Sequence, residues 1–407
     1  MSKKEVVRQL TSLQMSYLLG RKSILPLSGV SMQEYREYYG RIDKSRLLSR
    51  IKDMVGYHEC LRTYIDEENY EQYVVDEPVL NVDEIDLREG LGNEECFIQD
   101  FREKYSHEVL DLDKPLWNIT LIQRSNGYTT IFIKFDALIV DGRSISILIK
   151  ELFEDNFYIQ DVDESEQKKL KNIEHIHRDK AYWANKFSDL RYSPIKWNLP
   201  IMEIKESRFK RKSLLINNSI EEINRFCSKN GLFVNSFLIA VIMEVLATWK
   251  NTEFICCALP VLPLYKTKLS NNSSFIVVNW EKETSGITLE SIKGLQVEIM
   301  DRMEHLHFSG VELGRYLAHK NNIQVPLPIV ITSGLSWISL SKDCGVLQIS
   351  GLTQTPQIIM DIRFQAKEPE GCLNFDVDFV EQAIFDEDVV CLLNLIQEQL
   401  NTVITAS

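Results

Sequence analysis

Several short motifs that mark large enzyme classes are absent from this sequence. It contains no G-x-x-x-x-G-K-[ST] loop, no G-x-S-x-G turn and no H-E-x-x-H pair, and Gly90-Leu91-Gly92 lacks the third glycine of a dinucleotide-binding turn. Positive charge is also scarce, because 46 Lys and Arg stand against 59 Asp and Glu, for a formal net charge of −13. These features argue against nucleotide-driven chemistry and against non-specific binding to nucleic acid.

Cysteine spacing typical of metal sites or disulfide frameworks is missing as well. The eight cysteines include no C-x-x-C pair, and Cys256 and Cys257 stand in an apolar run that suits buried thiols on a strand. No apolar segment follows the charged N-terminus, and the longest uncharged stretch, 321–341, contains prolines and many polar groups. We therefore expect a cytoplasmic protein without a membrane span.

Two histidine pairs, His175/His177 and His305/His307, have the spacing with which an extended strand could bind zinc. Both pairs lie in charged stretches of helical character, where residues two apart do not face each other. We therefore expect solvated or capping histidines and no metal.

Composition and periodicity predict a globular protein of mixed helices and strands. The 407 residues are 44% apolar and 26% charged, and this length suits two compact units or one large one. Helices are expected over 14–19, 31–39, 44–56, 144–153, 237–249 and 386–403, and strands over 73–75, 128–135, 254–258, 275–279, 329–332, 346–350 and 357–364. Asn235 or Ser236 is expected to cap the fifth helix. The charged stretch 161–180 predicts two α/β halves (α+β sandwiches), 1–175 and 176–407.

A polar segment stands where the predicted strand 128–135 gives way to a helix. It reads Asp136-Ala137-Leu138-Ile139-Val140-Asp141-Gly142-Arg143-Ser144, with the pattern D-x-x-x-x-D-x-x-S. Two carboxylates followed by a hydroxyl could form a hydrogen-bonded turn that positions a loop. They could also act in catalysis, because loops at such places commonly hold functional groups.

This segment resembles the heterocyclization domains of nonribosomal peptide synthetases, which the same pattern distinguishes from their condensation-domain relatives. Those relatives carry H-H-x-x-x-D-G, and here Asp136 and Ala137 stand at the two histidine positions, so histidine-based condensation is not indicated. Further similarity is spread along the chain. The matching residues are Leu10-Thr11, Gln14, Tyr17 and Gly20-Arg21 (F-P-L-T-x-x-Q-x-A-Y-x-x-G-R), His58, Leu61 and Arg62 (R-H-x-M-L-R), residues 328–333 (P-x-V-F-T-S) and residues 353–361 (S-x-T-P-Q-V-x-L-D).

The resemblance implies an active pair, Thr332 and Asp361, in the last two of these motifs. Asp361 would donate a proton to a departing hydroxyl, and Thr332 would orient it. The residues alone also allow a hydroxyl bonded to backbone and a carboxylate paired with Arg363. Arg363 replaces the family's usual glutamine, and pairing with Asp361 would lower the pKa of that carboxyl and weaken the acid.

Two further segments depart from the family pattern. Residues 273–277, Ser-Ser-Phe-Ile-Val, correspond to G-D-F-T-S, and Pro260-Val261-Leu262 replaces a region where an Asn-Arg pair is common. These changes put the substrate and the ring-closing step in question. Because the chain begins with Met1 shortly before the first motif and ends soon after the last predicted helix, we expect a stand-alone protein.

The resemblance implies two lobes of the chloramphenicol-acetyltransferase type, arranged as a V with a tunnel between them. The implied reaction joins a carrier-bound acyl thioester to a Cys, Ser or Thr-type acceptor and cyclodehydrates the amide to a thiazoline or oxazoline, as in antibiotic or siderophore biosynthesis. Phosphopantetheine would arrive on carrier proteins, so no bound cofactor is expected. The alternatives are amide formation alone, with a free amine as one acceptor, and a non-catalytic carrier-binding module.

Other candidate residues follow from the same resemblance and from charge. Motif residues with a structural role are Arg21, Asp136, Asp141, Gly142 and Ser144. Candidates for the tunnel lining are Tyr17, Arg62, Ser333, Gln357 and Arg363. A cationic run would dock an acidic carrier protein or form an ordinary solvated segment; it comprises Lys205, Arg208, Lys210, Arg211 and Lys212.

Overall fold

The computed structural model describes residues 4–88, 93–154, 173–188, 195–205, 207–262, 268–284, 286–367 and 371–405. The chain divides into two compact units. Unit 1 comprises Met1–Val162, Lys266–Asn272 and Trp337–Pro356, and unit 2 comprises Asp163–Tyr265, Ser273–Ser336 and Gln357–Ser407. The predicted division near residue 175 did not include the two later segments that belong to unit 1.

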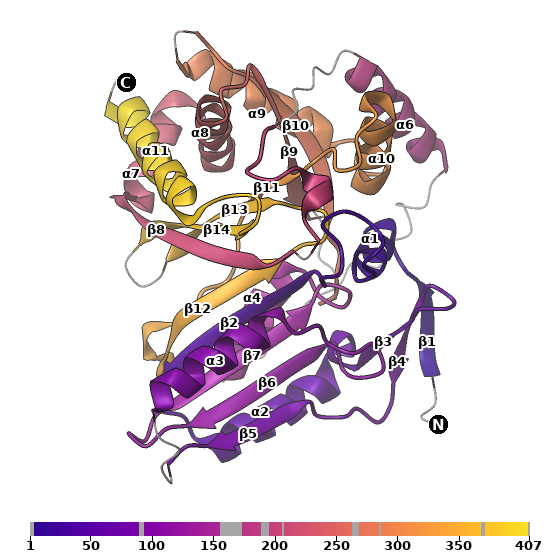
Figure 1. Cartoon of the computed structure of the whole chain (residues 1–407), viewed down its shortest axis with the longest axis vertical. Helices are drawn as coiled ribbons and strands as arrows, with labels where there is room; N and C mark the ends of the chain where they lie inside the picture. The colour runs from indigo at the N-terminus through magenta and orange to yellow at the C-terminus, as the bar shows by residue number, and fades with distance from the viewer. Residues whose placement is uncertain are drawn as a thin grey trace. The chain divides into compact units, whose positions relative to one another are not determined.

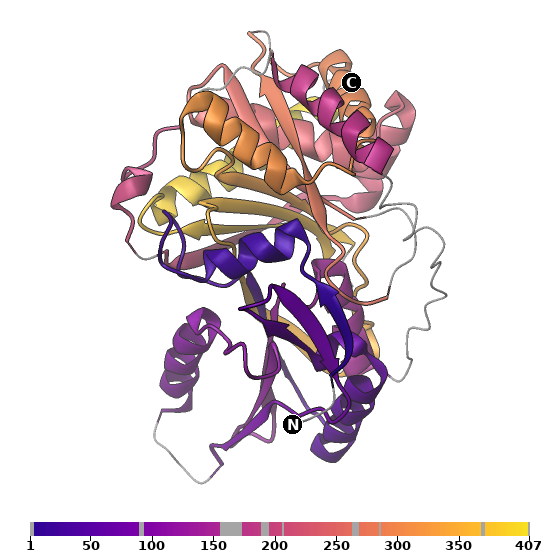
Figure 2. The same ribbon diagram turned by 90° about the vertical axis from the view of Figure 1, so that its right-hand side faces the viewer.

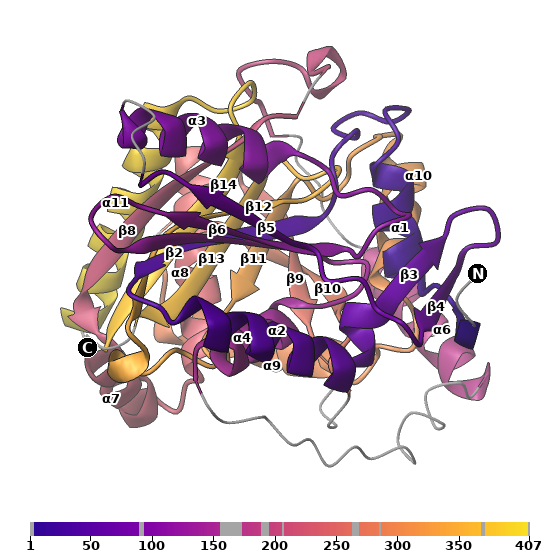
Figure 3. The same cartoon turned by 90° about the horizontal axis from the view of Figure 1, so that it is seen from below.

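Unit 1 is built on a five-stranded sheet with the order β12-β2-β7-β6-β5 (Figure 1). Helices α2 and α4 cover one face of this sheet and α3 covers the other (Figures 2 and 3). A second sheet has the order β1-β4-β3. The elements are β1 (Lys4–Gln9), α1 (Ser12–Gly20), β2 (Gln33–Gly40), α2 (Lys44–Tyr57), η1 (Glu59–Arg62), β3 (Thr63–Asp66), β4 (Glu71–Val75), β5 (Val82–Asp86), α3 (Glu94–His107), β6 (Trp117–Gln123), β7 (Thr129–Asp136), α4 (Gly142–Phe153), η3 (Lys342–Cys344) and β12 (Val346–Gln354).

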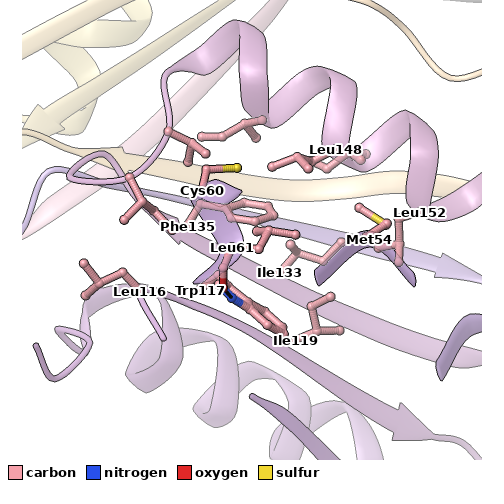
Figure 4. Packing of buried hydrophobic residues seen from close by; sticks show 14 of the residues in the cluster. Met54, Cys60, Leu61, Leu116, Trp117, Ile119, Ile133, Phe135, Leu148 and Leu152 are labelled. Atoms are coloured by element: carbon pink, nitrogen blue, oxygen red, sulfur yellow. Dashed lines mark hydrogen bonds between the residues drawn. The ribbon is translucent and has the colours of Figure 1, made fainter. Parts of the chain in front are cut away.

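The main core of unit 1 lies between the five-stranded sheet and helices α2 and α4. Figure 4 shows part of it, with Ile133 and Phe135 of β7 beside Met54 of α2 and Leu148 and Leu152 of α4. The predicted alternation along β7 accounts for this arrangement, because side chains two residues apart share a face of a strand. The core therefore fixes the end of β7, where the D-x-x-x-x-D-x-x-S segment begins.

The helix predicted over 31–39 is wrong, because these residues form strand β2. Its neighbours in the sheet are β7 and β12, and most of its side chains are buried. Buried charges along it are compensated: Arg36 Nε donates to Glu34 at 2.5 Å, and Arg102 donates to Glu37 at 2.5 and 2.8 Å. Pairing with β12, which lies more than 300 residues further along the chain, is a long-range effect that overrides local helix propensity.

Unit 2 is built on a six-stranded sheet with the order β10-β9-β11-β13-β14-β8. Helices α7, α8 and α11 lie together on one side of this sheet (Figure 1). The elements are α6 (Ile173–Ser188), η2 (Ile201–Glu203), β8 (Phe209–Ser219), α7 (Ile220–Asn230), α8 (Val234–Trp249), β9 (Phe254–Val261), β10 (Ser274–Glu281), α9 (Leu289–Met303), α10 (Gly310–Asn321), β11 (Ile329–Ser333), β13 (Met360–Lys367), β14 (Cys372–Val380) and α11 (Asp386–Thr405).

The remaining predicted helices and strands are present, with bounds that differ by a few residues at several ends. Cys256 and Cys257 lie buried on β9, as expected for thiols in an apolar strand. The cap predicted for α8 is wrong, because its N-cap is Phe233. Asn235 instead accepts a hydrogen bond from the Ser333 hydroxyl at 2.7 Å.

Within the described ranges, no single helix is long and apolar enough to cross a membrane. The pair α7 and α8, bent by 98°, meets the length and composition criteria only when the two helices are taken together.

Candidate active site

Thr332 and Asp361 lie beside each other in unit 2. Thr332 is near the end of β11 and Asp361 near the start of β13, and these two strands pair in parallel. The Thr332 hydroxyl donates a hydrogen bond to Asp361 Oδ1 over 2.8 Å. Asp361 is 5% exposed, and Thr332 is partly exposed. The structure thus brings together the hydroxyl and the carboxyl that the motifs single out.

Burial raises the pKa of the Asp361 carboxyl to about 6. The strongest opposing influence is the Arg363 guanidinium, as the sequence suggested, and the Thr332 hydrogen bond also lowers the pKa. The loss of hydration on burial raises the pKa of Asp361 by more than the attraction of the Arg363 guanidinium lowers it. Asp361 therefore keeps its proton to a higher pH than an exposed aspartate does.

The D-x-x-x-x-D-x-x-S segment begins in unit 1 with an ion pair between Asp136 and Arg21. Arg21 also donates to Ser31 Oγ at 3.0 Å and to the carbonyl oxygen of Leu110. Asp136 Oδ1 accepts the backbone N–H of Leu138 at 2.8 Å. Burial raises the pKa of Asp136 while Arg21 opposes the shift. These contacts connect the end of β7 to the end of α1.

The second half of the motif holds the segment 268–272 in place. Asp141 caps α4 by accepting the Ser144 N–H at 2.8 Å, and its other oxygen accepts the Asn272 N–H at 3.1 Å. The Ser144 hydroxyl donates to the carbonyl oxygen of Ser270 at 3.1 Å. Burial raises the pKa of Asp141. Of the two interpretations left open for this motif, these bonds support a turn that positions a loop.

Gly142 completes the turn because another side chain occupies the space beside it. A Cβ atom at this position would lie 2.6 Å from the ring of Trp337. Any larger residue would have to displace the indole, so the close approach accounts for the glycine.

The candidates for a substrate tunnel are divided between the units. Ser333, Gln357 and Arg363 belong to unit 2, and Tyr17 and Arg62 belong to unit 1. Arg363 is buried on β13, and Gln357 has a φ of 62° in the turn before that strand. The Arg62 guanidinium donates to a backbone carbonyl of β4 at 3.0 Å. Their contact with a substrate stays a prediction.

Most of the predicted cationic run carries its own counter-ions. Arg208, Lys210 and Lys212 form ion pairs with Glu381 or Asp386 at 2.7–3.7 Å, and Lys205 is exposed. Arg211 differs, because its side chain is only 13% exposed and its guanidinium forms an ion pair with the buried Asp378 carboxylate of β14. The run is thus divided between the two faces of β8, which leaves Arg211 on a buried face.

His305 and His307 bind one buried carboxylate, and His175 packs beside them. His305 Nδ1 and His307 Nδ1 each lie 2.9 Å from a different oxygen of the buried Asp179 carboxylate. The His175 ring packs edge-on against His307 with ring centroids 4.8 Å apart. Among the described residues, no group of three or more His, Cys, Asp or Glu side chains is arranged to hold a metal ion. The expected solvated or capping histidines are thus replaced, at 305 and 307, by partners of one carboxylate.

Sequence patterns did not single out Asp376 and Asp378 of β14, which lie across from β13 in the sheet. A signal was available, because β14 alternates polar and apolar residues over Asn374-Phe375-Asp376-Val377-Asp378-Phe379. Such alternation places both carboxyls on one face of the strand. It does not reveal which strands lie next to that face.

Known proteins resemble this chain over almost its whole length. It is 24% identical over 412 residues to bacitracin synthase 1 of Bacillus licheniformis, which covers 94% of this chain and 8% of that protein. It is 23% identical over 426 residues to pyochelin synthetase PchF of Pseudomonas aeruginosa, which covers 95% of this chain and 23% of that protein. The chain thus spans less than a quarter of the length of either relative.

A solved structure shares the fold. The cyclization-docking bidomain of the nonribosomal peptide synthetase EpoB from Sorangium cellulosum superposes with a TM-score of 0.86 at 21% identity, covering 97% of this chain and 84% of that one. The predicted fold class, mixed α/β with two chloramphenicol-acetyltransferase-like lobes, is therefore confirmed. The sequence also matches the Condensation domain family over residues 5–262, more than half of the chain, so the chain belongs to the condensation-domain family.

Proposed function

We propose that this chain is a heterocyclization domain of nonribosomal peptide biosynthesis, which forms an amide and then closes it to a thiazoline or oxazoline ring. The observation that carries this proposal is the buried Asp361 carboxyl bonded to the Thr332 hydroxyl. The similarity to a cyclization domain, and to a pyochelin synthetase, supports it.

The first step would join two carrier-bound substrates. The acceptor amine attacks the acyl thioester, a C–N bond forms, the C–S bond breaks, and the thiol of the donor carrier takes up the proton. Because the thioester is already activated, positioning supplies most of the required acceleration. Asp136, which replaces a histidine of the condensation motif, holds Arg21 and is not needed as a base in this step.

Ring closure asks more of the protein. The acceptor's sulfur or oxygen attacks the new amide carbonyl, the C=O π bond opens, and the proton of the thiol or hydroxyl passes to the former carbonyl oxygen, which gives a tetrahedral adduct that carries a hydroxyl. Asp361 then donates a proton to the departing hydroxyl, the C–O bond breaks and water leaves. A C=N bond forms as nitrogen gives up its proton, which restores the Asp361 acid. Thr332 fixes the orientation of the carboxyl throughout.

The raised pKa of Asp361 makes this role chemically reasonable. A carboxyl with a pKa of about 6 is protonated in about a tenth of molecules at pH 7, whereas an ordinary aspartate is protonated in fewer than about one in a thousand. Burial thus increases the acid form about 100-fold at neutral pH.

The substrates would arrive as phosphopantetheine thioesters on carrier proteins, which makes carriers and other synthetase subunits the expected partners. Lys205, Arg208, Lys210 and Lys212 are the candidates for contact with an acidic carrier. The ion pairs of the last three with Glu381 and Asp386 would have to exchange for the pairs with the carrier, so salt should weaken that contact.

The proposal is tested by product analysis with loaded carriers. We expect Asp361→Asn to leave the linear amide and to reduce ring formation at least about 100-fold, because the acid is removed while positioning is kept. Thr332→Ala should show the same loss of cyclized product to a smaller degree. Asp301→Asn, a carboxylate of α9 paired with Lys186, is the matched control and should leave the product ratio unchanged. Mass spectrometry distinguishes the two products by one water.

A second candidate function is amide formation without ring closure. Arg363 favours it, because its guanidinium stabilises ionised Asp361 and so opposes the acid form. A wild-type protein that yields only the linear amide would establish this alternative. A protein that binds loaded carriers and makes neither product would be a non-catalytic module.

A further inference from the structure

Asp361 belongs to a row of charged side chains that crosses three neighbouring strands of unit 2. On β13 and β14, Asp361 stands opposite Asp378 and Arg363 stands opposite Asp376. On β14 and β8, Asp378 stands opposite Arg211. Residues two apart share a face of a strand, so these five side chains lie on one face of the sheet. We refer to them as the charged ladder.

The charged ladder is buried and its charges do not balance. Asp361, Arg363, Asp376 and Asp378 are at most 5% exposed, and the Arg211 side chain is 13% exposed. Three carboxyls stand against two guanidiniums in the ladder, so full ionisation would give these five buried side chains a net charge of −1. Such a charge is costly, and like charges directly across two strands repel. The ladder therefore favours retention of one proton to a higher pH than an exposed aspartate shows.

The hydrogen bonds show which carboxyl is best placed to hold that proton. Asp378 accepts two bonds from Arg211, at 2.7 Å from Nε and 2.5 Å from Nη2. A bidentate guanidinium stabilises the ionised form of its partner. Asp361 accepts a bond from the uncharged Thr332 hydroxyl. Burial raises the pKa of Asp378 as it does that of Asp361, but Arg211 opposes this shift at Asp378. The charged partner thus favours ionised Asp378 and leaves the proton to Asp361.

Asp376 also has more partners than Asp361 that stabilise an ionised carboxylate. It accepts from the Ser213 hydroxyl at 2.5 Å and from Gln365 at 3.2 Å, and Arg211 Nη1 lies 3.9 Å away. These contacts lower the pKa of Asp376 in spite of its burial. Arg363, on the same strand as Asp361, attracts all three carboxyls.

We propose that Asp378, held ionised by Arg211, is a positioning residue that keeps the proton on Asp361 across the strand pair. This inference rests on the proposed function for its consequence, since the retained proton is the one that ring closure would use. Lys210 and Lys212, on the other face of β8, pair with Asp386 and do not face the ladder.

The test uses the full chain and two readouts, of which the first needs no substrate. Carboxyl ¹³C NMR follows the titration of aspartates, with Asp361→Asn and Asp378→Asn assigning the two signals. In the wild type we expect Asp361 to titrate near pH 6 while Asp378 stays ionised. In Asp378→Asn, which keeps the size of the side chain, the Asp361 midpoint should fall by about one pH unit or more, because the facing charge is gone. Asp301→Asn should leave it unchanged.

The second readout is the dependence of product on pH. In Asp378→Asn, ring formation at pH 7.5 should fall about tenfold relative to linear amide, and the fall should shrink toward pH 5.5, where Asp361 regains its proton. A merely structural defect would lower both products at every pH.

The outcomes separate this inference from the proposed function. An unchanged Asp361 midpoint in Asp378→Asn, or a wild type in which Asp378 and not Asp361 titrates near pH 6, overturns the inference. If Asp378→Asn does not fold, the wild-type titration still decides between these two assignments. Wild-type protein that makes no ring while Asp361 and Asp378 titrate as expected overturns the proposed function and leaves the positioning role intact.

Discussion

At the scale of single residues, Asp361 differs from most aspartates because its carboxyl is buried and its pKa is raised. Its carboxyl is buried against a hydroxyl and its pKa is raised to about 6. An unfolded chain would expose the same carboxyl with a pKa near its usual value of about 3.9. The folded protein therefore loses stability when Asp361 ionises.

This difference predicts that Asp361→Asn stabilises the protein while abolishing ring formation. The raised pKa means that the wild type is penalised as pH rises from about 4 to 6, and the penalty is complete above pH 6. The gain should be about 3 kcal/mol at pH 8 and about half of that at pH 5. Urea unfolding at the two pH values measures it. A gain that is equal at both would show that Asp361 titrates normally.

Sequence motifs singled out the candidate pair but not its surroundings. Thr332 and Asp361 were identified through P-x-V-F-T-S and S-x-T-P-Q-V-x-L-D, since a resemblance carries residues position by position. The effect of Arg363 could be anticipated in sign from its spacing to Asp361. The net direction of the pKa shift of Asp361 could not be anticipated. It depends on burial and on the facing Asp378, and both follow from the strand order of the sheet, which no local pattern contains.

At the scale of elements, the D-x-x-x-x-D-x-x-S segment shows how one aspartate serves a helix and a loop together. Asp141 caps α4 with one oxygen and holds Asn272 with the other. An exposed cap of the same type occurs at Asp43, which accepts the Arg46 N–H at 3.1 Å at the start of α2. The two aspartates differ in burial and in the second bond.

This pair gives a matched comparison of helix caps. Asp43→Ala should cost about 1 kcal/mol, the usual value of a lost cap. Asp141→Ala should cost about 2–3 kcal/mol, because it also leaves the Asn272 N–H without its acceptor. Asp141→Asn should fall between them, since an amide oxygen can still cap α4 but the amide nitrogen cannot accept. Equal costs for the two alanine variants would contradict the anchoring role of Asp141.

Two departures from the family pattern, separate in the sequence, are neighbours in the structure. Ser274 and Phe275 of β10 pair with Val261 and Pro260 of β9 in antiparallel register. Gly310, at the start of α10, packs against Phe275, where a Cβ would lie 2.4 Å from its carbonyl oxygen. The changes therefore form one altered patch on one strand pair. The sequence shows that both segments differ from the family pattern, but only the strand register shows that they lie next to each other.

At the scale of the whole molecule, unit 1 is assembled from three stretches of sequence. Its five-stranded sheet ends with β12, which pairs with β2, and the segment 268–272 is bonded to the turn before α4. The division at residue 175 that charge patterning favours would leave both segments out. Local signals locate helices and strands, but they do not show which sheet a strand joins.

This assembly predicts that residues 1–175 do not fold alone. Without β12, the backbone N–H and C=O groups along one edge of β2 are exposed, and such an edge pairs with other chains. Expression of 1–175 should give mostly aggregated protein, whereas the full chain should be monodisperse. Addition of residues 337–356 through a flexible linker should recover soluble material. A monomeric 1–175 with native near-UV circular dichroism would show that β12 is dispensable. Size-exclusion chromatography with light scattering reads out all three.

The late position of β12 also bears on how the protein is made. A ribosome has to translate Val346–Gln354 before β2 can pair with its second neighbour. One edge of β2 therefore stays unpaired during most of synthesis. At a translation speed of about 5–20 residues per second, that interval is on the order of tens of seconds. Chaperones that bind nascent chains and cover an unpaired strand edge would have their greatest effect during this interval.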